Sequence, residues 1–168
     1  MQPQRGIGDT LWHLPYLRAA ARDAAGGRVL LVTKPSTGAR ELLAAEPAVG
    51  EVAYLRQQPR RPAYLSRVLE VARICRRHDI RRLVILDKVG WPALAGRVAG
   101  VPERYGFGTR PSQLRWLTQA AGIDPALHRA HPLEKLPAFA EIMGWGAIDP
   151  EPRLPVSTLA ATAVAPLL

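Results

Sequence analysis

Short apolar runs alternate with helical patterns along most of the chain. The runs are rich in β-branched residues and are bounded by glycine, proline or charged residues, as buried β-strands are. They cover residues 28–33, 49–55, 82–87 and 103–108. Between them, apolar side chains recur every three or four positions and so lie on one face of an α-helix. The helical segments predicted in this way are residues 10–25, 35–46, 63–78, 91–99, 113–121 and 133–143.

The alternation of strands and helices predicts an α/β fold, a Rossmann-like open parallel sheet with helices on both faces. At 168 residues the chain suits one domain. Such a sheet opens with an apolar strand, but the five residues before Gly6 are mostly polar and include Pro3. Proline cannot donate to a sheet ladder. The first strand is therefore expected to be truncated.

The most informative motif is the run Gly6-Ile7-Gly8-Asp9 at the head of the first helix. A glycine turn lets a ligand approach the backbone, and the first N–H groups of a helix favour negative charge. Asp9 fits either a helix-capping residue or a chemically active carboxylate, and the two roles are compatible. The run is not the dinucleotide fingerprint, which needs a third glycine and a preceding strand. NAD binding is therefore disfavoured.

Polar residues follow the predicted strands and should meet at one edge of the sheet. In open parallel sheets, ligands bind at the carboxyl ends of the strands. The groups expected at this edge are Asp9, residues 33–34, residues 56–61, Asp87 with Lys88, and residues 107–110. Their convergence predicts a ligand site there.

The balance of charges points to an anionic partner. The chain carries 23 lysines and arginines against 14 aspartates and glutamates, a formal net charge of +9. A charge of this size favours association with nucleic acid, anionic lipid headgroups or phosphorylated sugars, although a solvated arginine-rich face without a ligand would have the same charge. No RNP, KH, helix-turn-helix or zinc signature is present, so no nucleic-acid partner is expected.

Cysteine usage and the lack of long apolar runs bear on the compartment. The single Cys75 cannot form an internal disulfide, which fits a reducing environment. No apolar run reaches membrane-spanning length, and the N-terminus has no signal-peptide pattern. A cytoplasmic location is therefore expected.

Taken together, these residues give the chain a likeness to a known family. It resembles the N-terminal half of glycosyltransferase family 9, the ADP-heptose:lipopolysaccharide heptosyltransferases. The likeness covers about residues 5–156 and depends on the order and spacing of several short motifs. These are Gly6-Ile7-Gly8-Asp9 with Leu14-Pro15, Pro47-Ala48-Val49-Gly50, Asp87-Lys88-Val89-Gly90, Arg97-Val98-Ala99-Gly100 and Arg104-Tyr105-Gly106-Phe107.

The resemblance implies one half of a two-domain GT-B enzyme that needs no metal or other cofactor. Residues 1–156 would form its acceptor-binding domain, and residues 157–168 an irregular tail or the start of an interdomain linker. The donor would be a nucleotide sugar such as ADP-heptose, bound by a C-terminal domain missing from this sequence. The acceptor would be an anionic glycolipid or lipopolysaccharide core. Such a half is expected to be a truncated, inactive piece that is cytoplasmic or peripheral at the inner face of the cytoplasmic membrane.

The resemblance also implies residue roles. Asp9 would be the general base that takes the proton from the acceptor hydroxyl. The acceptor would lie against Gly8, Thr10, Arg60, Arg61, Lys88 and Arg110. The planar fork of arginine suits carboxylate and phosphate oxygens, whereas Val89 stands where the family usually has glutamine. The alternative to an enzyme is a non-catalytic basic α/β domain that binds anionic lipid headgroups or nucleic acid.

Overall fold

Parallel strands and helices alternate through residues 1, 6–56 and 63–155, the part of the chain that the computed structural model describes. The strands are β1 (Val29–Thr33), β2 (Val49–Tyr54), β3 (Arg82–Ile85), β4 (Glu103–Gly106) and β5 (Gln119–Ala120). The α-helices are α1 (Ile7–Trp12), α2 (Leu14–Arg22), α3 (Ala39–Leu42), α4 (Ala63–Arg77), α5 (Trp91–Ala99), α6 (Pro111–Leu114) and α7 (Leu136–Met143). Short 3₁₀ helices are η1 (Pro35–Thr37), η2 (Pro125–Leu127) and η3 (Pro132–Lys135). The predicted α/β class is confirmed.

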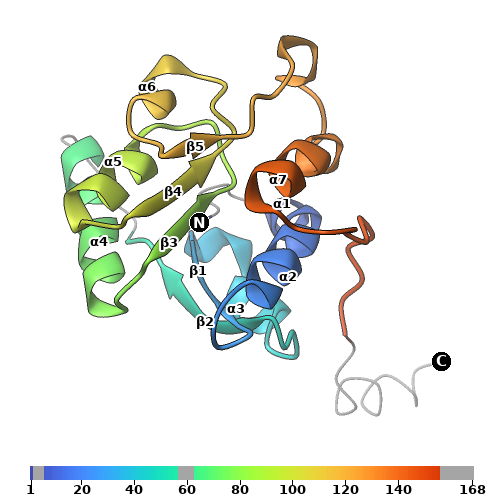
Figure 1. Cartoon of the computed structure of the whole chain (residues 1–168). Helices are drawn as coiled ribbons and strands as arrows, with labels where there is room; N and C mark the ends of the chain where they lie inside the picture. Colours follow the sequence, from blue (N-terminus) through green and yellow to red (C-terminus); the bar gives the residue numbers. More distant parts are fainter. Residues whose placement is uncertain (2–5, 57–62, 156–168) are drawn as a thin grey trace.

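The strands form two small parallel sheets. One sheet pairs β1 with β2, and the other has the order β3-β4-β5. In the first, Leu31 lies beside Val52; in the second, Val84 lies beside Tyr105 and Gly106 beside Ala120. This arrangement is compatible with a Rossmann-like fold, but the expected single sheet is interrupted between β1 and β3 (Figure 1).

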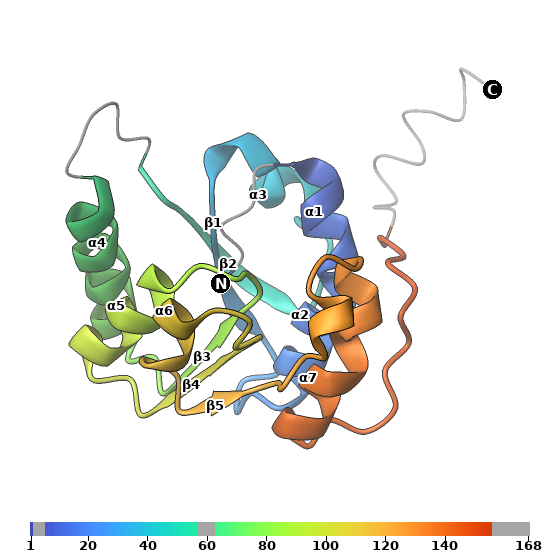
Figure 2. The same cartoon turned by 90° about the horizontal axis from the view of Figure 1, so that it is seen from above.

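Helices cover both faces of the strands, and each face has its own apolar core. Successive side chains of a strand point to opposite faces, so Leu31 packs in one core and its neighbour Val32 in the other. The first core contains residues of α2, α3 and α7, and the second contains residues of α4 and α5. Figure 2 shows α4 and α5 on one side of the strands and α1, α2 and α7 on the other. Both cores take residues from β1 and from β3, so the two sheets belong to one layer.

Several of the expected helices differ from the structure. The helix expected over residues 35–46 is the 3₁₀ helix η1 followed by the short α3, which ends at Leu42. The helix expected over residues 10–25 is divided at His13 into α1 and α2. Pro15 explains the division because a proline has no N–H and its ring collides with the carbonyl four residues earlier. The predicted helix over residues 113–121 is wrong. Helix α6 ends at Leu114, and Gln119–Ala120 instead pairs with β4, where sheet pairing outweighs helical propensity.

An ion pair between the half-exposed Arg18 and a buried carboxylate, which the sequence did not indicate, joins α2 to the turn before β2. The Glu46 side chain is 1% exposed and accepts hydrogen bonds from Arg18 Nη2 at 2.8 Å and Nε at 3.2 Å. Its other carboxylate oxygen accepts the N–H of Ala48 at 3.2 Å. Arg18 also donates to the carbonyl of Arg153. Through this hydrogen bond, Arg18 also attaches the segment after α7 to α2.

Candidate functional site

Asp9 lies in the first turn of α1, where its carboxylate closes the glycine turn. Its Oδ2 accepts the backbone N–H of Gly6 at 3.2 Å. Thr10 is buried, and its hydroxyl donates to the carbonyl of Gly6 at 3.3 Å. The capping role considered for Asp9 is therefore present in the structure. Within the part of the chain that the structure describes, no hydrogen bond reaches its other carboxylate oxygen, Oδ1.

Positive charges gather around Asp87 at the carboxyl end of β3. Asp87 Oδ1 accepts the backbone N–H groups of Lys88 and Val89. Burial raises the pKa of Asp87, while these two hydrogen bonds and the charges of Lys34 and Arg110 lower it in part. Lys34 follows β1 and Arg110 follows β4, so charges from the ends of two other strands act on the carboxylate that follows β3. The predicted convergence at this edge is confirmed for these residues.

Two lysines from different parts of the chain, Lys88 after β3 and Lys135 at the end of η3, meet at the segment between η2 and α7. The Nζ atoms of Lys88 and Lys135 both donate to the carbonyl of His128. Lys135 also donates to the carbonyl of Ala130 at 2.8 Å, and its Nζ lies 5.7 Å from the ring centroid of Phe107. Burial and the nearby charge of Lys88 lower the pKa of Lys135. Sequence reasoning missed Lys135 because its local pattern places it in an ordinary helical segment.

Aromatic contacts attach the same loop to α1. The rings of Trp12 and His131 meet edge to face with centroids 4.2 Å apart. His13 is buried at the end of α1, and its Nδ1 bonds to the backbone carbonyl of Asp9. Burial lowers the pKa of His13 to about 4. The loop thus brings α1, with Asp9, and the cations near β3 onto a common edge.

Gln113 holds the loops after β3 and β4 together. It is fully buried and donates to the carbonyls of Asp87 at 2.6 Å and Val89 at 3.3 Å. Its Oε1 accepts the N–H of Gly108 at 2.9 Å. Gly90 permits this packing, because a Cβ there would lie 2.1 Å from the carbonyl oxygen of Ser112. The backbone near Asp87 and Lys88 is therefore fixed by a side chain that no sequence motif had marked.

The residues predicted for the acceptor site have different surroundings. Gly8 is exposed on α1 with open space around its Cα, and Arg110 is exposed. Lys88 is half-buried and adjoins Asp87, whereas Thr10 is enclosed. No hydrogen bond or ion pair between described residues joins Asp9 to Lys88 or Arg110. Arg60, Arg61 and the expected tail at residues 157–168 lie outside the described residues.

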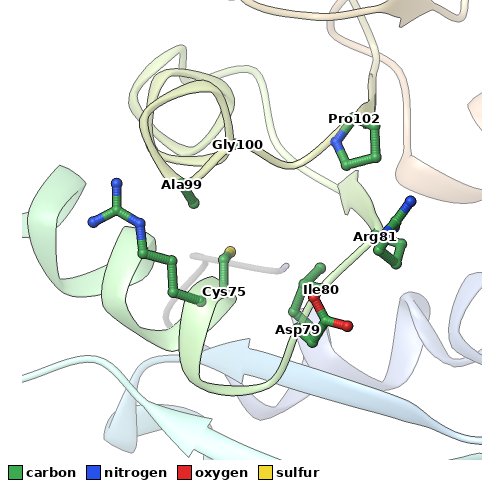
Figure 3. Close-up of a pocket in the computed structure, with 8 residues that line it drawn as sticks. Cys75, Asp79, Ile80, Arg81, Ala99, Gly100 and Pro102 are labelled. Atoms are coloured by element: carbon green, nitrogen blue, oxygen red, sulfur yellow. The ribbon is translucent and has the colours of Figure 1, made fainter.

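Two hollows lie at the opposite, amino-terminal edge of the strands. One has a volume of about 340 Å³ and is lined by residues 75–76, residues 79–81, Ala99, Gly100 and Pro102 (Figure 3). The other, of about 510 Å³, lies between Arg18, Glu46 and Asp149. The thiol of Cys75 is buried, and burial raises its pKa. Neither hollow contains a residue predicted for the site.

The described residues contain neither a membrane-spanning helix nor a cluster of metal-binding side chains. No described helix has the length and apolar character needed to cross a membrane. Within the same part of the chain, no group of three or more histidine, cysteine or acidic side chains is arranged to hold a metal ion.

Comparison with known proteins adds no relative. The chain matches no family model, and neither the curated proteins nor the solved structures yield a similar protein. Functional inference therefore depends on the geometry of the carboxyl edge and on the motifs of the chain.

Proposed function

We propose that this chain is the acceptor-binding half of a sugar transferase of the glycosyltransferase family 9 type, with the fold of a GT-B N-terminal domain. The observation that carries the proposal is that the charges of Lys34 and Arg110 act on Asp87, with Lys88 next to it in the chain, at the same edge of the strands as Asp9. Cations reaching one place from separate strand ends suit a ligand that bears several negative charges. Phosphorylated glycolipids, including a lipopolysaccharide core, have this character.

Asp9 supplies the chemistry in this proposal. In an inverting transfer the acceptor hydroxyl attacks the anomeric carbon of the nucleotide sugar, and the nucleoside diphosphate leaves from the opposite face. The hydroxyl proton passes to the Asp9 carboxylate, which acts as general base. The bond from Gly6 to Oδ2 holds the carboxylate in place, and in this proposal the second oxygen takes the proton. The donor sugar, such as ADP-heptose, binds to a separate domain, so residues 1–168 by themselves bind acceptor without transferring sugar.

Exposed apolar side chains near the same edge favour a second candidate, a non-catalytic domain that binds anionic lipid headgroups. Ile7, Trp12 and Leu114 are 54%, 41% and 47% exposed. They lie on α1, the helix of Asp9, and on α6, which begins directly after Arg110. Apolar side chains beside lysine and arginine are typical of proteins that lie on a membrane surface. Both candidates are consistent with a cytoplasmic protein that is peripheral at the membrane.

Calorimetric titration with a lipid A-linked inner-core oligosaccharide in detergent micelles tests the proposal. We expect Lys88→Met and Arg110→Met each to weaken binding about tenfold, because each removes a charge-assisted contact. Arg77→Met is the matched control, since Arg77 ends α4 at the amino edge. Equal weakening by all three variants would show only a general effect of net charge. Equal binding to anionic phospholipid vesicles without sugar would favour the headgroup-binding domain.

A further inference from the structure

Met1 occupies a position in the sheet that normally belongs to a central strand. Its nitrogen donates to the carbonyl of Val84, and its carbonyl accepts the N–H of Leu86 at 2.9 Å. These are the two hydrogen bonds of a parallel bridge opposite Ile85. Figure 1 shows the N-terminus between β1 and β3, where the two sheets separate. Of the residues that the structure describes, Met1 alone stands in this gap, aligned with β3.

The edges of β1 and β3 that face this gap carry further backbone N–H and C=O groups. The N–H of Val29 donates to the carbonyl of Ala48, so the backbone groups of Val29 point toward β2. The backbone groups of successive residues in a strand point in opposite directions. The backbone N–H and C=O groups of Leu30 and Val32 therefore point away from β2. On β3, the backbone groups of Arg82 point away from β4. No hydrogen bond between described residues reaches them from the gap. Backbone groups in a sheet interior need partners, and an unpaired group there is costly.

The walls of the gap are apolar on both sides of the sheet. Leu31, Val84 and Leu86 belong to the core against α2 and α7. Val32, Ile85 and the side chain of Met1 belong to the core against α4 and α5. A strand between β1 and β3 would have helices on both faces, and such strands are nearly continuous apolar runs. The gap is thus a slot for an extended apolar segment.

The orientation of Met1 determines how such a segment is attached. Met1 runs parallel to β3, so three residues placed before it would lie opposite Val84, Leu83 and Arg82. A separate peptide would have to end against the buried nitrogen of Met1, leaving a carboxylate in an apolar interior. We propose that the slot between β1 and β3 takes an extended apolar segment, parallel to both strands, that continues through a peptide bond into the nitrogen of Met1. This inference is independent of the proposed function.

Adding residues before Met1 tests the proposal directly. We expect the extension Val-Leu-Ile-Val to raise the Tm of the chain by about 5 °C or more, because it buries apolar area and completes two ladders. Hydrogen exchange at the amides of Leu30, Val32 and Arg82 should slow at least about tenfold. The control is Gly-Ser-Gly-Ser at the same place, which adds equal length with little apolar surface. Equal Tm and equal exchange in the two extended chains would overturn the proposal, as would the same stabilisation by the free peptide.

Acetylation of Met1 is a second test that adds no hydrophobic tail. Burial lowers the pKa of the Met1 amine from 8.0 to about 5, while Cys75 raises it in part. The amine in turn contributes to the lowered pKa of His13. The unfolded chain therefore takes up this proton between pH 8 and 5 while the folded chain does not, so acidification destabilises the fold. Acetylation converts the titrating amine into an uncharged amide, whose N–H can still donate to the carbonyl of Val84 as a peptide group of a strand would. We expect the Tm advantage of the acetylated chain to grow as the pH falls from 8 to 6, and a constant or negative difference would overturn the proposal.

Discussion

Replacing Asp9 by asparagine is expected to lower the rate of sugar transfer about 10²- to 10⁴-fold, the usual contribution of a positioned general base. The assay uses the chain joined to the donor-binding domain of a family 9 transferase, because residues 1–168 are expected to be inactive alone. Asparagine keeps the size of the side chain, and its amide oxygen still accepts the N–H of Gly6. It cannot take the acceptor proton. The substitution therefore separates the base from the cap.

The expected pattern for Asp9→Asn is a lower kcat with nearly unchanged acceptor affinity and Tm. Asp149→Asn is the matched control, because Asp149 also accepts a local backbone N–H, that of Glu151 at 2.9 Å, but lines the hollow at the amino edge. Its kcat should equal that of the parent protein. If Asp9→Asn retained kcat within a few-fold, Asp9 would be a helix cap only. Transfer by residues 1–168 without a donor-binding domain would contradict the assignment of this chain as one half of the enzyme.

Folding stability should fall on acidification because His13 is buried in its neutral form. Burial lowers its pKa from 6.5 to about 4, while the hydrogen bond to the Asp9 carbonyl and the charge of Asp9 raise it in part. Between these values the unfolded chain binds a proton that the folded chain does not. Stability is therefore complete above pH 6.5 and falls as the pH drops toward 4. The loss due to this residue is on the order of 3 kcal/mol.

Urea unfolding at pH 7 and at pH 4.5 measures this effect. His13→Gln and His13→Phe should both show a smaller loss of unfolding free energy between the two pH values than the parent chain. Glutamine retains a hydrogen-bond donor for the Asp9 carbonyl, and phenylalanine retains an aromatic ring near Tyr16, 5.8 Å away between centroids in the parent. If both variants show the same smaller loss, the pH dependence of the unfolding free energy is due to protonation of His13. Parallel pH curves for parent and variants would show that His13 protonates without opposing the fold.

Elements fixed by local signals could be predicted from the sequence. Helix α5 runs from Trp91 to Ala99 as expected, because Gly90 and Gly100 bound its apolar face. Strand β1 differs from its predicted range by one residue, since a β-branched apolar run between polar segments has few alternatives. Residues 113–121 were harder to predict, because the pairing of Gln119–Ala120 with β4 has no local signature.

The candidate site was predictable only in outline. Topology alone brings Lys34, Asp87 and Arg110 to one edge, because parallel strands end together. The supporting contacts join positions far apart in the chain: Gln113 bonds to the carbonyl of Asp87, 26 residues away, and Lys88 bonds to that of His128, 40 residues away. Such pairings depend on the packed loops, which no spacing along the chain encodes. The Arg18–Glu46 ion pair, 28 residues apart, was missed for the same reason.

The most direct test of acceptor binding at the carboxyl edge is an amide chemical-shift titration of the 168-residue chain with the inner-core oligosaccharide phosphate. We predict that saturable shifts concentrate at residues 8–10, 87–90 and 108–110, with small changes at residues 79–81 and 99–102 around the opposite hollow. Shifts centred on that hollow, or shifts that fail to saturate and spread over arginines on every surface, would contradict a built acceptor site at this edge.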